Sequence, residues 1–166
     1  MDTIRYAMSR IELERPSWQT LVVSASKEVA QPAEALWRAF TRLETWPAWS
    51  APLHRATRWL GDPDWVPGAT FEQTLQLGFP IGRQVATVTL GAVEPARMVS
   101  WWHTDGGLRS CHVWDFDEVS PGRTRVTDTE VFHGLAMGLV KPLVASRWRS
   151  LFAGSVAGLE RAADQG

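Results

Sequence analysis

The stretch LAMGLVKPLVASRWRSLFAGSVAGLERAA, residues 135–163, organises the rest of the chain. Its apolar residues recur every three or four positions, which is the spacing of one face of an α-helix. We predict a single long amphipathic helix of roughly 40 Å at ~1.5 Å per residue, bent or restarted near Pro142, which has no amide donor. Such a helix is longer than a small domain needs to cap a core, so another part of the chain must curve around it. The residues assigned to its apolar face are Leu139, Leu143, Val144, Trp148, Leu151, Phe152, Val156 and Leu159.

Small residues interrupt this helix at Ala153, Gly154, Ala157 and Gly158. A glycine inside a helix costs about 1 kcal/mol relative to alanine. Two explanations stay open: a close approach of the helix to another surface, or room for a guest molecule.

The bulk composition excludes several classes of protein. The chain has 166 residues and a net charge of -1, with no basic stripe or acidic tail that would indicate a nucleic-acid partner. No apolar run is long enough to span a membrane, and residues 1–15 carry charges where a signal peptide would be apolar. We expect a cytoplasmic protein without a stable membrane anchor, and the sequence leaves its oligomeric state open. The single cysteine, Cys111, cannot form an internal disulfide.

Tryptophan is unusually frequent, with ten residues against one tyrosine and six phenylalanines. Aromatic side chains supply large buried areas with specific ring geometry. The count suits either a heavily packed core or an aromatic-lined pocket, and core packing accounts for most of them.

Local patterns give the order of the remaining elements. Residues 20–29 alternate as a strand, and Pro32 with Glu34 begins a short helix that ends near Leu43. A turn or second short helix follows at Trp46-Pro47. Turn residues then recur about every 8 to 14 residues from Thr57 onward, which indicates an antiparallel meander of about six strands and an α+β arrangement. The clearest strands are residues 70–77, 85–93, 98–104, 108–119 and 124–133. We expect one domain over residues 20–166, preceded by an extension, residues 1–19, whose structure the pattern does not decide.

Hairpin registers show which strand residues share a face. A two-residue turn at Gly106-Gly107 places Trp101 opposite His112, and a loop at Ser120–Gly122 places Asp117 opposite Arg125. The charged pair suits a solvated outer face, which supports the register. For residues 85–93 the facing stays open. The inner-face set is then Val99, Trp101, His103, His112, Trp114, Phe116, Val126, Asp128, Glu130 and Phe132, with Phe71, Gln73, Leu75 and Leu77 from the earlier strand.

Three polar members of this apolar set, His112, Asp128 and Glu130, are the candidate catalytic residues. Ionisable groups removed from water must pair or change protonation state, and a histidine against two carboxylates meets that requirement. Two interpretations stay open: a general acid/base set in an apolar pocket, or a structural polar network that ties three strands and the final helix together. No metal-ligand spacing is present, so we expect no metal and no cofactor. Cys111 alternates to the outer face, and His54 and His133 are interpreted as surface residues.

Two segments, VAQPAEALW (29–37) and WPAWSAP (46–52), resemble the opening of the START-like (SRPBCC) superfamily, in particular its polyketide cyclase/dehydrase and lipid transport group. Later segments agree, including EPAR (94–97) and the long terminal helix. The resemblance implies a helix-grip fold: a curved antiparallel sheet of about seven strands around the long helix, with two short helices closing one end and an internal cavity. Family members often have a histidine two residues before the glutamate of the last strand. Here Asp128 occupies that position, and His112 on the neighbouring strand offers an imidazole instead.

The resemblance implies that the chain binds a hydrophobic or aromatic, polyketide-like small molecule. If it is an enzyme, cyclisation or dehydration is the expected reaction, of a lyase or isomerase type. The alternative is a non-catalytic carrier or sensor of a lipid or other hydrophobic ligand. The residues expected to contact the ligand are Phe71, Gln73, Leu75, Val99, Trp101, His103, Trp114, Phe116, Phe132, Trp148 and Phe152.

Overall fold

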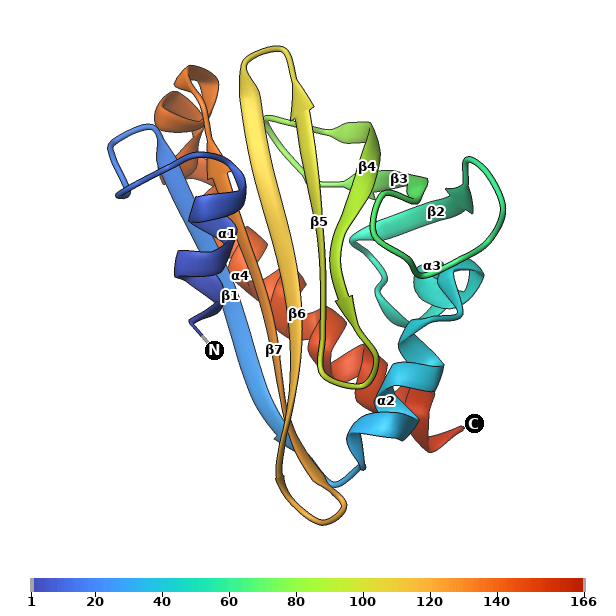
Figure 1. The fold of residues 1–166 in the computed structure, drawn as a ribbon. Helices are drawn as coiled ribbons and strands as arrows, with labels where there is room; N and C mark the ends of the chain where they lie inside the picture. Colours follow the sequence, from blue (N-terminus) through green and yellow to red (C-terminus); the bar gives the residue numbers. More distant parts are fainter. Residues whose placement is uncertain (1, 166) are drawn as a thin grey trace.

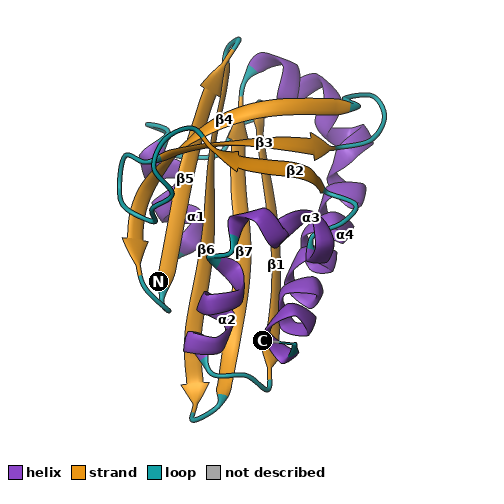
Figure 2. Ribbon diagram, turned by 90° about the vertical axis from the view of Figure 1, so that its right-hand side faces the viewer, coloured by secondary structure: helices purple, strands orange, loops and turns teal. Residues whose placement is uncertain are grey.

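The computed structural model describes residues 2–165. A seven-stranded antiparallel sheet, in the order β1-β7-β6-β5-β4-β3-β2, curls around the long helix α4 (Figures 1 and 2). The predicted α+β architecture, with two short helices after the first strand and a long C-terminal helix, is confirmed. The elements are α1 (Thr3–Arg10), β1 (Thr20–Val29), α2 (Ala33–Phe40), the 3-10 helix η1 (Leu43–Thr45), α3 (Trp46–Trp49), β2 (His54–Trp59), β3 (Thr70–Gln76), β4 (Arg83–Glu94), β5 (Met98–Asp105), β6 (Leu108–Ser120), β7 (Arg123–His133) and α4 (Leu135–Asp164).

Short turns set the sheet register that the sequence predicts. Both residues of the Gly106-Gly107 turn have positive φ, a conformation that glycine adopts without steric cost and that matches strand twist. Trp101 therefore pairs with His112, and Asp117 pairs with Arg125 in an ion pair of 3.5 Å. The predicted inner and outer faces of β5, β6 and β7 follow from this register.

The buried face of α4 differs in part from the prediction. Val144 and Trp148 are buried, but Leu139 is 70% exposed and Leu143 is 64% exposed. The assignment of these two leucines to the buried face is wrong, because about 100° of rotation per residue puts Leu139 half a turn away from Trp148. The helix continues through Pro142 as a single element.

One of the small residues in α4 marks a close approach. A Cβ at Gly158 would lie 1.8 Å from the Trp49 carbonyl oxygen, so only glycine lets α4 touch α3 there. A Cβ at Gly154 would meet nothing within 4 Å. Close helix packing therefore explains Gly158, and neither packing nor a guest explains Gly154.

The outer face of the sheet is partly covered by α1. Ala7 and Ile11 from the N-terminal segment pack against Cys111, Val113 and Val131. Cys111 does lie on the outer face, as expected from alternation, but it is only 1% exposed because this segment covers it. None of the helices within residues 2–165 combines the length and hydrophobicity needed to cross a membrane. The division into an extension (1–19) and one domain (20–166) stays a prediction.

Candidate functional site

The interior under the sheet has two ends that are filled differently. At the end covered by α2 and α3, aromatic rings pack against one another without a gap between neighbours. The Phe40 ring lies 5.0 Å from Trp46 and 5.3 Å from Trp114 between centroids, and Trp46 lies 5.5 Å from Trp101. Such spacings are those of offset and edge-to-face aromatic pairs. We call this region the aromatic end; its rings are Trp37, Phe40, Trp46, Trp49, Trp59, Trp65, Phe71, Trp101, Trp114 and Phe116.

The opposite end, under the first half of α4, is hollow. A cavity of about 310 Å³ lies there between α4 and the inner faces of β3 to β7, and we call this region the hollow end. Its walls are mainly aliphatic, with one tryptophan and one phenylalanine. The Trp148 indole is held in the wall by a hydrogen bond of 3.2 Å that it donates to the Leu77 carbonyl oxygen. The cavity is lined by Gln73, Leu75, Leu77, Ile81, Gln84, Val85, Ala86, Val88, His103, Asp105, Leu108, Ser110, Glu130, Phe132, Ala136, Met137, Val140 and Trp148.

The predicted ligand contacts divide between these two ends. Gln73, Leu75, His103, Phe132 and Trp148 line the cavity, as does the candidate catalytic residue Glu130. The other predicted contacts do not line it. Phe71, Val99, Trp101, Trp114 and Phe116 belong to the aromatic end, and Phe152 packs beside His112.

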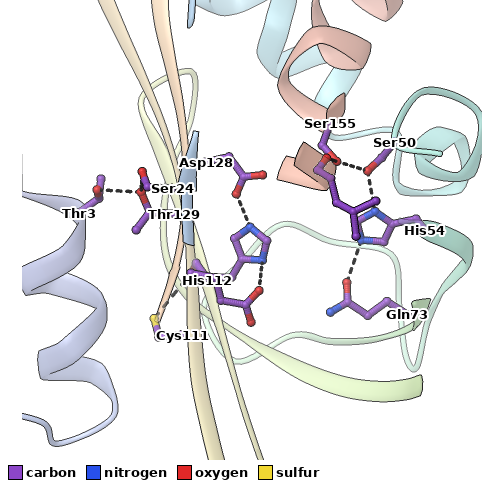
Figure 3. A network of polar contacts seen from close by, with 12 residues as sticks. Thr3, Ser24, Ser50, His54, Gln73, Cys111, His112, Asp128, Thr129 and Ser155 are labelled. Atoms are coloured by element: carbon purple, nitrogen blue, oxygen red, sulfur yellow. Dashed lines mark hydrogen bonds and ion pairs between the residues drawn. The ribbon is translucent and has the colours of Figure 1, made fainter. Parts of the chain in front are cut away.

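His112 joins the two carboxylates that the register placed beside it (Figure 3). Its Nε2 is hydrogen-bonded to Asp128 Oδ1, and its Nδ1 lies 3.1 Å from Glu130 Oε2. Asp128 is fully buried, whereas the Glu130 side chain keeps 13% of its surface exposed and reaches the cavity wall. The three residues that the sequence singled out are therefore one connected group, and Glu130 is the member that lines the cavity.

The electrostatics of this group keep a proton on His112. Burial alone would disfavour the imidazolium, but the charges of Asp128 and Glu130 outweigh it and raise the pKa of His112 to about 10. Burial also raises the pKa of Asp128, to about 6, against the opposing effect of the His112 cation. At neutral pH His112 is therefore an imidazolium paired with the Asp128 carboxylate.

Aromatic rings enclose the His112 cation on two sides. The Trp101 ring centroid lies 4.5 Å from that of His112, and the Phe152 ring is stacked on it at 5.2 Å and 12°. A cation held against aromatic faces gains electrostatic stabilisation when water is excluded. Among residues 2–165, Asp128 Oδ2 and Trp101 Nε1 are buried polar atoms without a hydrogen-bond partner. Because His112 contacts Trp101 of the aromatic end and Glu130 of the cavity wall, it lies at the border between the aromatic end and the hollow end.

A second buried histidine, His54, was missed, and its interpretation as a surface residue is wrong. It is 5% exposed, with Ser50 Oγ at 2.8 Å from Nδ1 and Gln73 Oε1 at 3.1 Å from Nε2. Burial lowers its pKa to about 4, so it is neutral at pH 7. The signal was available, because His54 pairs with Leu75, which alternation had already placed on the inner face. His133 is partly buried and contacts Thr20 Oγ1 at 3.1 Å.

Other reactive side chains do not form a site. Within residues 2–165 no group of three or more His, Cys, Asp or Glu side chains is arranged to hold a metal ion. Burial raises the pKa of the Cys111 thiol to about 12, so the thiolate is scarce at neutral pH. A surface hollow of about 480 Å³ near the β4–β5 turn carries several carboxylates, such as Asp115 and Asp117, and lacks the apolar walls of a ligand pocket.

Comparison with known proteins identifies the family. Residues 20–164 match the family described as polyketide cyclase / dehydrase and lipid transport, and the chain belongs to it. The predicted START-like membership is thereby confirmed. A comparison with curated proteins gives no match.

Solved structures share the fold at low sequence identity. A protein from Thermus thermophilus superposes with a TM-score of 0.71 at 15% identity, covering 87% of this chain and 98% of that one. The ZhuI aromatase/cyclase from a Streptomyces species gives 0.69 at 13% identity, covering 88% and 94%. Norcoclaurine synthase from Thalictrum flavum gives 0.65 at 15% identity, covering 86% and 92%. These likenesses establish the helix-grip architecture.

Proposed function

We propose that this protein binds a small, hydrophobic, ring-containing molecule in the hollow end, with Glu130 as a polar contact. The observation that carries the proposal is a mainly apolar cavity into which a single buried charge network opens through one carboxylate. Binding sites for small molecules are typically apolar with a few placed polar groups. Membership in a polyketide cyclase and lipid transport family supports a hydrophobic ligand, and the aromatase/cyclase among the structural neighbours supports an aromatic one.

The size of the cavity favours a compact ligand. Its volume of about 310 Å³ is at the lower end of the roughly 300–1,000 Å³ that is usual for small-molecule sites. A molecule of two or three fused rings suits this space better than a lipid with two acyl chains. If the protein is a carrier, a small aromatic compound is therefore the expected ligand.

A second candidate function is catalysis at the same site, and the His112 network favours it. Glu130 would take a proton from a carbon next to a substrate carbonyl, and the same proton would pass to a hydroxyl that leaves as water. His112 would stabilise the Glu130 carboxylate before the first transfer and after the second, while Asp128 fixes the imidazole orientation. Positioned acid/base groups contribute about 10² to 10⁴ in rate, and the apolar walls exclude competing water.

A cavity-filling substitution tests the binding proposal. Val140 lines the cavity, whereas its neighbour Leu139 points away and is 70% exposed. In titration calorimetry with a naphthol, Val140→Trp is expected to weaken binding by about tenfold or more, because the indole occupies the ligand volume. Leu139→Trp is the matched control and should bind as the natural protein does. Equal affinities for both variants would contradict binding in this cavity.

Separating turnover from binding decides between enzyme and carrier. Mass spectrometry of small molecules that co-purify with the protein would first supply a candidate substrate. With that compound, Glu130→Gln is expected to reduce turnover by about 10² or more while the dissociation constant changes only a few-fold. Full turnover in Glu130→Gln would refute the catalytic candidate, and an equal loss of binding and turnover would favour the carrier.

A further inference from the structure

A chain of buried hydroxyl, imidazole and amide groups ends at the cavity wall. Ser155 Oγ lies 2.7 Å from Ser50 Oγ, which lies 2.8 Å from His54 Nδ1. The other nitrogen of that ring, Nε2, is 3.1 Å from Gln73 Oε1. All four side chains, drawn in Figure 3, are 5% exposed or less, and Gln73 is the member that lines the cavity.

The chemistry of these groups fixes the direction of the hydrogen bonds. A carbonyl oxygen only accepts, so His54 must carry its proton on Nε2 to bond Gln73 Oε1. A neutral imidazole then has a bare Nδ1, which accepts the proton of the Ser50 hydroxyl. The low pKa of His54 agrees with the neutral form. Because Ser50 gives its one proton to His54, it can only accept from Ser155, whose hydroxyl also lies within 3.2 Å of the Leu151 carbonyl oxygen as a donor.

This arrangement leaves the amide nitrogen of Gln73 for the cavity. Its oxygen is occupied by His54, and its nitrogen is turned away from His54 toward the side of the interior where His112 lies (Figure 3). Residues 2–165 supply no hydrogen-bond acceptor for this nitrogen. Gln73 therefore presents a hydrogen-bond donor at the β3 wall of the cavity.

The opposite wall presents an acceptor. Glu130 lies on β7, with β6, β5 and β4 between it and the β3 strand that carries Gln73. One of its oxygens faces His112 Nδ1, which leaves Oε1 to accept a hydrogen bond from a bound molecule. No lysine or arginine is among the residues that line the cavity, all of which fall within the described part of the chain.

We propose that Gln73 and Glu130 form a donor and acceptor pair across the cavity and select the ligand. The preferred ligand carries a carbonyl-type acceptor for Gln73 and a hydroxyl-type donor for Glu130, at separate positions on one aromatic framework. His54 and Ser50 are positioning residues that hold the Gln73 amide in this orientation. The inference rests on the proposed binding function and names the chemical class of its ligand.

A set of matched probes tests the selection. The probes are naphthalene, a naphthol, an acetylnaphthalene, and a hydroxy-acetylnaphthalene with its two groups at opposite ends of the rings. By titration calorimetry the probe with both groups should bind tightest, with each group improving the dissociation constant about fivefold to tenfold. Gln73→Leu should remove the gain from the acetyl group and leave the gain from the hydroxyl group unchanged.

Two further variants make the result specific. Gln73→Glu keeps the acceptor for His54 and removes the N–H donor, so it should also abolish the acetyl gain, even if Gln73→Leu folds poorly. Gln76→Leu is the matched control on the same strand, since Gln76 does not line the cavity, and it should preserve both gains. If the acetyl gain persists in Gln73→Glu, the assignment of Gln73 is overturned.

The positioning role has its own spectroscopic readout. NMR of isotope-labelled histidine nitrogens should show His54 protonated on Nε2 and bare on Nδ1. The reverse tautomer would mean that Gln73 presents its oxygen to the cavity, which overturns the inference. Binding of all four probes with equal affinity would overturn the inference while leaving the proposed function intact. Failure of every probe, naphthalene included, would overturn both.

Discussion

The aromatic end and the hollow end lie under the same curved sheet, and the same strand alternation points side chains into both. They differ in what covers them. α2 and α3 bring Trp37, Phe40, Trp46 and Trp49 against the sheet, and these rings fill the space. The first half of α4 brings Ala136, Met137, Val140 and only one large ring, Trp148, and these leave part of the space empty. A curved sheet thus provides room at both ends, and the covering helices decide whether that room becomes core or cavity.

Removing one large side chain from each end should expose this difference most strongly. Trp46 is 1% exposed and surrounded by rings, so Trp46→Ala should lower the free energy of unfolding by about 3–5 kcal/mol. Leu75 already borders the cavity, so Leu75→Ala should cost about 1 kcal/mol, because fewer contacts are lost. Urea denaturation measures both values. Equal losses would mean that the two ends are packed alike.

A substitution at His112, on the border between the two ends, should lower the free energy of unfolding by nearly as much. His112→Leu leaves the buried carboxylate of Asp128 without its cationic partner, so unfolding should become easier by about 3 kcal/mol at pH 7. Adding Asp128→Asn to this variant should restore part of the loss, since it removes the unpaired charge. A loss below about 1 kcal/mol in the single variant would show that the ion pair contributes little.

Alkaline pH should remove the His112 proton in the natural protein and so lower its free energy of unfolding. His112 has an ordinary pKa of 6.5 in the unfolded chain and about 10 in the folded protein. Between these values the folded state holds one more proton than the unfolded chain. The contribution of His112 to the free energy of unfolding is therefore fully present below pH 6.5 and is lost as pH rises toward 10, by at most about 1.4 kcal/mol per pH unit. Urea denaturation at pH 7, 8 and 9 would measure the slope. His112→Leu should lack this slope, and an identical slope in that variant would assign it to other groups.

The smallest effect is expected on the outer side of α4. Leu143 is 64% exposed, so Leu143→Ser should change the free energy of unfolding by less than about 0.5 kcal/mol. Its neighbour Val144 is fully buried, and Val144→Ser should cost about 2 kcal/mol or more. Thermal or urea unfolding of both variants fixes the rotational position of the helix over the cavity. A large loss for Leu143→Ser would place that leucine against another surface.

Much of the architecture follows from local rules in the sequence. Strand alternation and the turn at Ser120–Gly122 place His112 opposite Glu130, because register and face are both set by turn length. The long helix also follows from its apolar spacing. These features depend on residues close together in the chain, or on a single hairpin.

The candidate site could be predicted only in part. Strand alternation places Trp101 on the interior and helical spacing places Trp148 there, but neither pattern can show that one lies in the packed end and the other lines the cavity. That outcome depends on which helix covers each strand, which is a long-range property. Leu139 was misplaced because local spacing was not converted into rotation around the helix. His54 was missed although its partner across the hairpin, Leu75, was placed inward.

The central claim, that one end of the interior is hollow and apolar while the other is filled, has a direct test that needs no knowledge of the ligand. Xenon occupies apolar cavities in proteins. Crystals pressurised with xenon should show it between α4 and the inner face of β3 to β7, beside Val140 and Leu75, and none among the rings around Trp46. Xenon among those rings, or none in the hollow end, would contradict the account.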